Sequence, residues 1–392
     1  MSLLYNFNMY YFDWTATTPM SNSAIEEYAS CARKYIGNPS STHGLGIEAA
    51  QRLIEERKKT AAMLGTTASN IYFTSGGTES DSIVISSLLK SPSPGEIIST
   101  GIEHSAVLEW RKTLEATGWK FTVLQCPGGY LNPETLEKAL NDKVRMVCVM
   151  KVNNVTGTIQ DTKTLASIIR NKEKEYGRHI HFHCDAVQAL GKIPFNLSEE
   201  DIDSAAFSAH KFKGPRGVGI LYNRNKAITA LSRGGGQENG LRPGTENLAG
   251  ICAMNKALAE ALDSLDENYQ KILVFRNKIE ILSSELGIKL LSPSSYNESA
   301  FSPYIISISV KPIPSEVFLR VMSDKGFCLS AGSACSSNTK GKAEGVLAAM
   351  NVDPMDRRSS IRISFGANTT EEEVDLLCNA IKDTYKELGY GK

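Results

Sequence analysis

Short apolar runs of strand length alternate with longer runs of helical periodicity through the first two-thirds of the chain. Asn70–Thr74 is such a run, and a helical pattern from about Thr78 to Lys90 follows the Ser-Gly-Gly that ends it. Glu96–Thr100 and His104–Thr117 repeat this order of strand and helix. Further strands are predicted at Phe121–Gln125, Val144–Val152, Ile180–Cys184, Ala205–Phe207 and Val218–Tyr222. The alternation predicts an α/β fold with a parallel or mixed sheet covered by helices.

The pattern changes after about residue 260. A charged helical stretch is followed by a strand, a helix, a second strand and a final helix, which predicts a second unit of α+β type. Their predicted bounds are Glu260–Leu286, Pro303–Val310, Pro314–Lys325, Ile361–Phe365 and Thr370–Leu388. We therefore expect a large domain over residues 15–260 and a small domain formed by residues 1–14 and 261–392. No linker rich in Pro or Gly separates them, so the two domains should share a long helix.

The charge balance narrows the classes of protein to which the chain can belong. Its 392 residues carry 43 Lys+Arg and 43 Asp+Glu, and 41% of them are hydrophobic. A disordered chain combines low hydrophobicity with high net charge, and a protein that binds nucleic acid by neutralising phosphates needs a basic excess. We expect neither class. A net charge of zero leaves association into an oligomer open.

The sequence carries no signal for export or for a membrane. The first basic residue is Arg33, and the longest apolar stretches, such as Met146–Met150, are too short to span a bilayer. Eight cysteines without a CxxC pair do not form a disulfide scaffold. We therefore expect a cytoplasmic protein with reduced thiols and no membrane partner.

One cysteine differs from the others in its surroundings. Most of the eight lie in apolar sequence, as small buried side chains do. Cys335 lies among Ser, Ala, Gly, Asn and Thr, where no large apolar neighbour would bury it. This composition predicts a mobile loop over about residues 326–345, and an exposed thiol is a liability unless it is used. Cys335 is therefore a candidate functional residue.

Three polar features follow predicted strands. The turn Thr74–Glu79 lies between a strand and a helix, where backbone N–H groups can bind a phosphate, although a plain turn has the same composition. Asp185 ends a strand, at the edge of the sheet where ligands bind. Lys211 follows the next strand and could form a Schiff base if it is desolvated, although a surface lysine is the alternative.

A metal site is a further possibility at three alternating histidines. His179, His181 and His183 face the same way if the segment is a strand. Neighbouring side chains on one strand rarely complete a coordination shell, so we predict no metal there.

A single cofactor accounts for the turn, His104, Asp185 and Lys211 together. A phosphate would lie on the turn, a ring nitrogen on the carboxylate and an aldehyde on the lysine. These groups all belong to pyridoxal 5'-phosphate.

Motifs spread from about residue 10 to residue 385 resemble those of the cysteine desulfurases, a group within the class V aminotransferase family. The resemblance implies a fold-type I pyridoxal-phosphate-dependent transferase, whose large domain has a mixed, mostly parallel sheet covered by helices and whose smaller domain is α+β. It also implies a homodimer with shared active sites. The matching segments are Tyr11–Pro19, Gly37–His43, Thr74–Ser80, Glu103-His104, Val152–Asn154, Asp185–Gln188, Ser208–Lys211, Gly234–Glu238, Arg242–Thr245, Gly332–Cys335 and Ser360–Ser364.

The resemblance implies a role for each matching site residue. Lys211 would hold the cofactor, Asp185 would pair with its ring nitrogen and Gln188 would bond its ring hydroxyl. His104 would stack on the ring and shuttle protons, and Cys335 would accept the sulfur. Gly77, Thr78, Ser208 and His210 would bind the cofactor phosphate. Arg362 and Asn154 would bind the substrate carboxylate, and Asn154 would also contact the cofactor. Thr245 would bind the cofactor phosphate of the partner subunit.

The implied reaction converts L-cysteine to L-alanine and leaves the sulfur on Cys335 as a persulfide. Sulfur-acceptor proteins would carry it to iron–sulfur clusters, thio-cofactors or tRNA. A selenocysteine lyase or a related class V lyase is the alternative enzyme. A protein that binds the cofactor and passes sulfur without turnover is the alternative from another class.

Four positions differ from the residues common in the family. They are Trp14, Lys151, Val155 and Lys213. None of them removes a group that the implied reaction needs, but they could alter substrate preference or cofactor affinity.

Overall fold

A seven-stranded sheet forms the centre of the computed structural model, which describes residues 9–295, 301–332 and 344–389. The strand order is β2-β8-β7-β6-β5-β3-β4, and β8 alone runs antiparallel to its neighbours. This confirms the predicted mixed, mostly parallel sheet. The strands are β2 (Ile71–Thr74), β3 (Glu96–Thr100), β4 (Lys120–Leu124), β5 (Val144–Cys148), β6 (His181–Asp185), β7 (Ser204–Ser208) and β8 (Gly219–Asn223).

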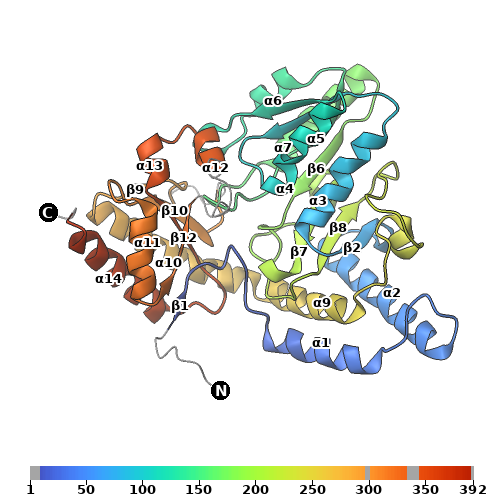
Figure 1. Ribbon diagram of the computed structural model, residues 1–392, viewed down its shortest axis with the longest axis horizontal. Helices are drawn as coiled ribbons and strands as arrows, with labels where there is room; N and C mark the ends of the chain where they lie inside the picture. The colour runs from blue at the N-terminus through green and yellow to red at the C-terminus, as the bar shows by residue number, and fades with distance from the viewer. Residues whose placement is uncertain (1–8, 296–300, 333–343, 390–392) are drawn as a thin grey trace.

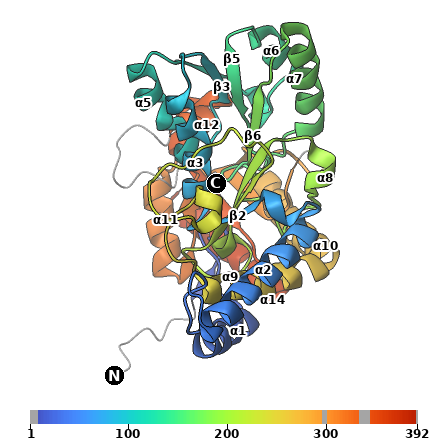
Figure 2. The ribbon, with the colours of Figure 1, turned by 90° about the vertical axis from the view of Figure 1, so that its right-hand side faces the viewer.

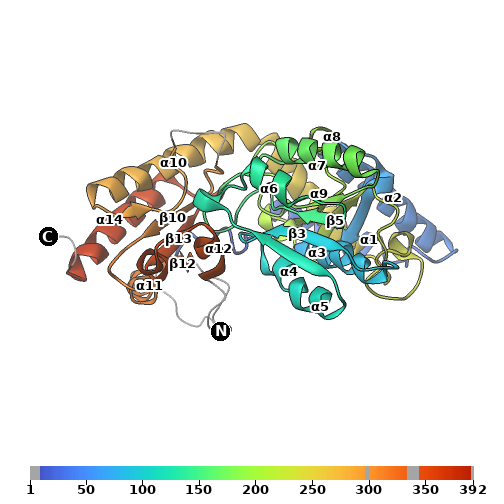
Figure 3. The ribbon, with the colours of Figure 1, turned by 90° about the horizontal axis from the view of Figure 1, so that it is seen from above.

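Helices cover both faces of this sheet, so its central strands are buried on both sides. Along β5, Val147 packs into one apolar core, and Met146 and Cys148 pack into the other, as the two-residue period of a strand requires. Helices α5 and α7 lie on opposite sides of the strands in Figures 2 and 3. The helices of this part of the chain are α1 (Asn22–Lys34), α2 (Gly44–Leu64), α3 (Gly77–Ser86), α4 (Ser105–Leu108), α5 (Trp110–Ala116), α6 (Pro133–Ala139), α7 (Thr162–Tyr176), α8 (Leu197–Glu200) and α9 (Leu248–Asp263).

A second, antiparallel sheet with the order β12-β13-β10-β9 lies beside the first, and helices pack against it (Figure 1). Its elements agree with the predicted α+β unit. They are α10 (Leu265–Glu285), β9 (Lys289–Leu290), β10 (Ile305–Ser309), α11 (Ser315–Asp324), β11 (Phe327–Cys328), β12 (Ser330–Ala331), α12 (Glu344–Ala349), α13 (Pro354–Arg358), β13 (Ser360–Ser364) and α14 (Glu371–Glu387).

Two predicted helices are interrupted. The stretch predicted as Glu260–Leu286 consists of α9 and α10, which meet at Ser264. The Ser264 hydroxyl donates to the carbonyl of Glu260 at 2.7 Å, a local bond that competes with the helical backbone pattern. The helix predicted over His104–Thr117 is likewise divided at Glu109 into α4 and α5.

An N-terminal strap, residues 10–18, joins the two sheets. Its first residues form β1 (Tyr10–Tyr11), which pairs in parallel with β11, and the Phe12 carbonyl accepts from the Ser364 N–H at 2.8 Å. At its other end, the Thr18 N–H donates to the His210 carbonyl at 3.0 Å. The strap therefore bonds to β13 on one side and to the segment after β7 on the other (Figure 1).

In the described part of the chain, helices are either too short or too polar to cross a bilayer.

Gly366→Ala should destabilise the junction between the strap and the second sheet. A Cβ at this position would overlap the buried indole of Trp14, so we expect the free energy of unfolding to fall by about 1–3 kcal/mol. Urea unfolding followed by circular dichroism measures the change. Gly44→Ala is the matched control, because nothing lies within 4 Å of its added Cβ, and it should leave stability equal or slightly higher. Equal stability of Gly366→Ala and the wild type would contradict this packing.

Candidate active site

A cavity of about 340 Å³ lies where the parallel strands end, and it gathers ten of the predicted site residues. Strand order explains this, because the carboxyl ends of parallel strands open onto one edge of a sheet. Asp185 ends β6, Ser208 ends β7 and His104 follows β3. Arg362 enters from β13 of the other sheet. The ten residues are Gly77, Thr78, His104, Asn154, Asp185, Gln188, Ser208, His210, Lys211 and Arg362.

Lys211 is held against the N-terminal strap. It lies in the 3-10 turn Ala209–Lys211, directly after β7, and its Nζ donates to the carbonyls of Thr15 at 2.7 Å and Ala16 at 2.8 Å. The amino group of this half-buried lysine therefore lies at the cavity, held by two backbone carbonyls.

Arg362 is also fixed by the strap. Its Nη2 donates to Asp13 Oδ1 at 2.8 Å and its Nη1 to the carbonyl of Asn154 at 2.9 Å. Among the described residues, its buried Nε has no hydrogen-bond partner. A carboxylate in the cavity would match such a guanidinium in charge and geometry. Sequence reasoning missed Asp13, although it lies within a matching motif.

Asp185 has a second buried carboxyl beside it in the cavity wall. Its Oδ1 accepts from the Val187 N–H at 3.0 Å. Asp81, which sequence reasoning missed, also lines the cavity, and burial followed by the negative charge of Asp185 raises the pKa of Asp81 well above its ordinary value. The signal was its spacing: Asp81 lies four residues after Gly77 and so one helical turn along the same face of α3.

A buried hydrogen-bond chain reaches Asp81 from the amino-terminal end of β6. The chain begins at Asn225, whose Oδ1 accepts from the Ala227 N–H. The Asn225 amide nitrogen, Nδ2, therefore faces His181 and donates to its Nδ1 at 2.9 Å. Since Nδ1 of His181 accepts, its Nε2 must donate to the Ser204 hydroxyl, at 2.7 Å. The Ser204 hydroxyl in turn donates to His183 Nδ1 at 2.7 Å, and His183 Nε2 donates to Asp81 Oδ1 at 3.0 Å. Burial lowers the pKa of His181 to about 3 and that of His183 to about 4. Both rings are therefore neutral at neutral pH.

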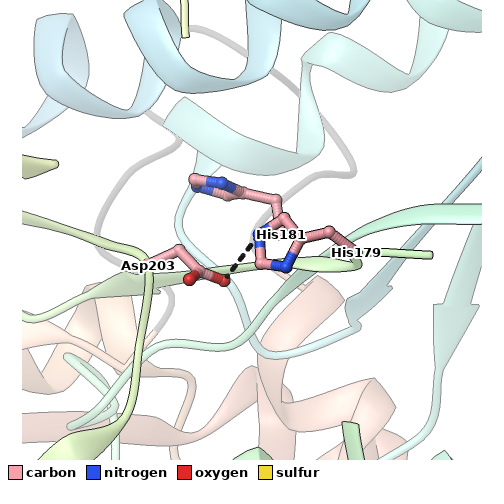
Figure 4. A group of neighbouring side chains, drawn as sticks. All are labelled: His179, His181 and Asp203. Atoms are coloured by element: carbon pink, nitrogen blue, oxygen red, sulfur yellow. Dashed lines mark ion pairs between the residues drawn. The ribbon is translucent and has the colours of Figure 1, made fainter. Parts of the chain in front are cut away.

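The one group of potential metal ligands in the described ranges is His179, His181 and Asp203 (Figure 4). Asp203 already pairs with Arg170 at 2.9 Å and with Arg224 at 3.0 Å, and both nitrogens of His181 are engaged in the buried chain. Two guanidinium groups beside the carboxylate oppose a further cation. We therefore assign Asp203 to an ion-pair network with the two arginines and His181 to the buried hydrogen-bond chain.

The α3 end of the cavity suits a phosphate. A second hollow of about 320 Å³ shares Gly77, Thr78, Ser208 and His210 with the first and adds Arg216. The ten-residue helix α3 begins there at Gly77, so its first N–H groups point to this end. A Cβ at Gly77 would lie 2.5 Å from a Val187 methyl, so glycine lets the backbone approach closely.

His104 has a defined tautomer. It caps α4 by accepting the Ala106 N–H on Nδ1 at 3.2 Å, so in the neutral ring the proton is on Nε2. In this state His104 can donate a hydrogen bond from Nε2, and a change of tautomer is needed before Nε2 can act as the base that the sequence suggested.

Of the two remaining predicted site residues, one lies elsewhere and the other is not described. Thr245 is exposed and does not line the cavity, and Cys335 lies outside the described residues. Burial raises the pKa of each of the seven described thiols. In the described ranges the structure therefore contains no activated thiol.

The four residues that differ from the family pattern do not line the cavity. Lys151 is buried in an ion pair with Glu200 at 3.1 Å. Trp14 packs on Gly366, and Lys213 donates to Asn368 at 2.8 Å. Any effect of these positions on substrate preference would therefore be indirect.

The donor set fits the predicted cofactor. One cavity presents an amino group at Lys211, a carboxylate at Asp185 and a helix start that receives a phosphate. Together with the mostly parallel sheet, this arrangement defines a fold-type I pyridoxal-phosphate-dependent enzyme.

Comparison with known proteins agrees with this class. The chain belongs to the class-V aminotransferase family, whose model matches residues 10–377. A "NifS/IcsS protein homolog" of Lactobacillus delbrueckii subsp. bulgaricus is 38% identical, over 97% of this chain and 98% of that protein. "Cysteine desulfurase IscS" of Dictyoglomus turgidum is 36% identical, over 96% and 95%. A solved "NifS-like protein" superposes with a TM-score of 0.87 at 36% identity, over 97% of this chain and all of that one.

The buried neutral His181 should make stability depend on pH. Its pKa is about 3 when folded, below the ordinary 6.5, so the unfolded chain binds the proton first. Its contribution is complete above about pH 6.5 and is lost as the pH falls toward 3. Between about pH 7.5 and pH 5, His181→Gln should lose about 2 kcal/mol less unfolding free energy than the wild type, as urea titrations would measure.

The difference between the pH profiles of His181→Gln and the wild type gives the contribution of His181 alone to the pH dependence of stability. Glu103, whose pKa burial raises to about 8, acts in the opposite direction but is common to both proteins. Parallel profiles for His181→Gln and the wild type would contradict the neutral buried ring.

Proposed function

We propose that the protein is a pyridoxal-phosphate-dependent cysteine desulfurase, which converts L-cysteine to L-alanine and transfers the sulfur to Cys335. One observation carries the proposal: the strap holds Lys211 and Arg362 at the same cavity, an amino group for the cofactor and a guanidinium for an amino-acid carboxylate. Relatives named cysteine desulfurases, aligned over nearly the whole chain, support this substrate.

The residues of the cavity would hold the cofactor as follows. Lys211 would link to its aldehyde, Asp185 would pair with its ring nitrogen and Gln188 would bond its ring hydroxyl. Gly77, Thr78, Ser208 and His210 would bind the phosphate at the start of α3, beside Arg216. The bound cofactor supplies an electron sink for the charge left when the substrate loses its α-proton.

Arg362 and His104 would act on the substrate. The two η nitrogens of Arg362 are fixed by Asp13 and Asn154, so the guanidinium meets a carboxylate in one orientation. His104 donates from Nε2 in its resting tautomer. To accept the proton of a thiol on Nε2, the neutral ring would first have to carry its own proton on Nδ1 instead.

Cys335 would receive the sulfur. Its thiolate would attack the sulfur of L-cysteine, the carbon–sulfur bond of the substrate would break, and the three-carbon remainder would take up a proton and leave as L-alanine. The transferred sulfur would stay on Cys335 as a persulfide. The raised thiol pKa of every described cysteine supports this choice, because a buried thiol is a poor nucleophile.

We further propose a homodimer in which Thr245 completes the neighbouring site. Large apolar side chains are exposed at Ile36, Leu45, Ile47 and Ile54, on α2 and just before it, by between 47% and 70%. An open hollow nearby is lined by Ser40 and Arg57 and by residues of the segment 236–246, which carries Thr245. A second copy on this face would cover the apolar side chains and bring the segment to the partner's site.

Three finer statements belong to the same proposal. The large domain, residues 15–260, would stay rigid around the cofactor, and the small domain, residues 1–14 and 261–392, would carry the Cys335 loop. The protein would work in the cytoplasm, where its thiols stay reduced. It would pass sulfur to acceptor proteins for iron–sulfur cluster, thio-cofactor or tRNA biosynthesis.

The Cys335→Ala variant tests the sulfur transfer. It should keep the visible absorbance band of the bound cofactor yet lose nearly all sulfide and alanine production from L-cysteine with a reductant, because no thiol remains to take the sulfur. Cys378→Ala, at a thiol of raised pKa, is the matched control and should keep wild-type rates. Full turnover by Cys335→Ala would refute its role.

Lys211→Ala tests the cofactor site and should lose the visible absorbance band, because no lysine remains to link to the cofactor.

Mixed dimers test the role of Thr245. When Lys211→Ala subunits are combined with Thr245→Ala subunits, one site of each mixed dimer has both an intact lysine and an intact threonine from its partner. Its activity should exceed that of either parent. The control combines the wild type with a subunit that carries both changes, where the mixed dimer has no complete site. No gain in the first mixture would show that Thr245 acts within its own subunit, if at all.

A further inference from the structure

Lys192 is a buried lysine beneath the floor of the cavity that the proposed reaction does not use. Only 6% of its surface is exposed, and in the described ranges no carboxylate forms an ion pair with it. The turn after β6 brings it there, because Gly191 adopts φ +72° and the chain folds back on itself. Its Nζ donates to the Gln188 side-chain oxygen, Oε1, at 2.7 Å.

The charges around Lys192 oppose its own charge. Burial first, and then the positive charges of Lys211 and Arg362, lower the pKa of Lys192 to about 7. On its other side, Glu260 and Lys213 line a small hollow of about 80 Å³ together with Lys192. A methionine of similar length would fill this place without the cost of burying a cation. Packing alone therefore does not explain a lysine here.

The contacts with Lys192 and with the Thr15 carbonyl orient the Gln188 amide. A charged lysine has hydrogen-bond donors only, so the amide turns Oε1 toward it. The amide nitrogen Nε2 then lies on the other side and donates to the Thr15 carbonyl at 3.1 Å. The same carbonyl accepts from Lys211, so Lys192, Gln188, Thr15 and Lys211 form one connected network.

We propose that Lys192 is a positioning residue for the cofactor: it locks the Gln188 amide with Nε2 on the cavity side, so that Gln188 can only donate a hydrogen bond to the cofactor's ring oxygen. The inference rests on the proposed roles of Gln188 and Lys211. A fixed donor at that point stabilises the ionised ring oxygen. The positive charge of Lys192 also lies near the nitrogen of Lys211 and disfavours a second positive charge there.

A pH titration of the visible band of the bound cofactor tests the role of Lys192, because its midpoint reports the proton on the nitrogen that links Lys211 to the cofactor. Lys192→Met removes the nearby charge and the lock on Gln188, so we expect the midpoint to rise by about one pH unit. Lys192→Arg should return it toward the wild-type value. Lys112→Met, at an exposed lysine of α5, is the matched control and should leave it unchanged.

A double-mutant cycle tests whether Lys192 acts through Gln188. Gln188→Leu should raise the midpoint in the same direction, and the double variant should shift it by clearly less than the sum of the single shifts. Equilibrium dialysis should show that Lys192→Met binds the cofactor about tenfold more weakly, which corresponds to one lost hydrogen bond. Circular dichroism and thermal unfolding confirm that each variant is folded, and Lys192→Gln replaces Lys192→Met if that variant does not fold.

The outcomes separate this inference from the proposed function. An unchanged midpoint in Lys192→Met, or fully additive shifts in the double variant, would overturn the positioning role. Retention of the visible band in Lys211→Ala would overturn the proposed cofactor site itself. Loss of the band in Lys211→Ala together with a raised midpoint in Lys192→Met would support both.

Discussion

The structure of the site depends on the hydrogen bonds of the N-terminal strap. Asp13 holds Arg362 of the second sheet, and the carbonyls of Thr15 and Ala16 hold Lys211 of the first. Neither sheet could place both side chains alone, because Lys211 follows β7 of the first sheet and Arg362 lies on β13 of the second. A few bonds from a short segment thus fix the distance between the group that would carry the cofactor and the group that would bind the substrate.

The strap can do this because most of its bonds use backbone atoms. Thr18 bonds to the carbonyl of His210, and Phe12 accepts from the N–H of Ser364, so both ends are held regardless of side-chain type. Trp14 adds packing to these bonds, since its indole packs on Gly366, where no larger residue fits.

Burial sets the electrostatics around the cavity. On one side, Asp81 and Asp185 lie together, and the neutral ring of His183 donates to the first of them. On the other side, Lys192 and Lys211 lie close together, with neutral carbonyl and amide groups between them. The carboxylates would pair with a ring nitrogen of the ligand, and the cationic end would pair with its anionic groups.

The sequence by itself determined the strands, their alternation with helices, and the polar residues that follow them. Asp185, Ser208 and Lys211 were predictable because residues at the carboxyl ends of parallel strands meet at one edge. Only the tertiary structure decided the rest. Asp81 faces the cavity because α3 turns it there, and Asp13 because the strap crosses between two sheets. Lys192 lies behind the cavity wall, on Gln188, because a left-handed glycine folds the chain back. Such contacts depend on how separate elements pack, and a local pattern of residues does not record that packing.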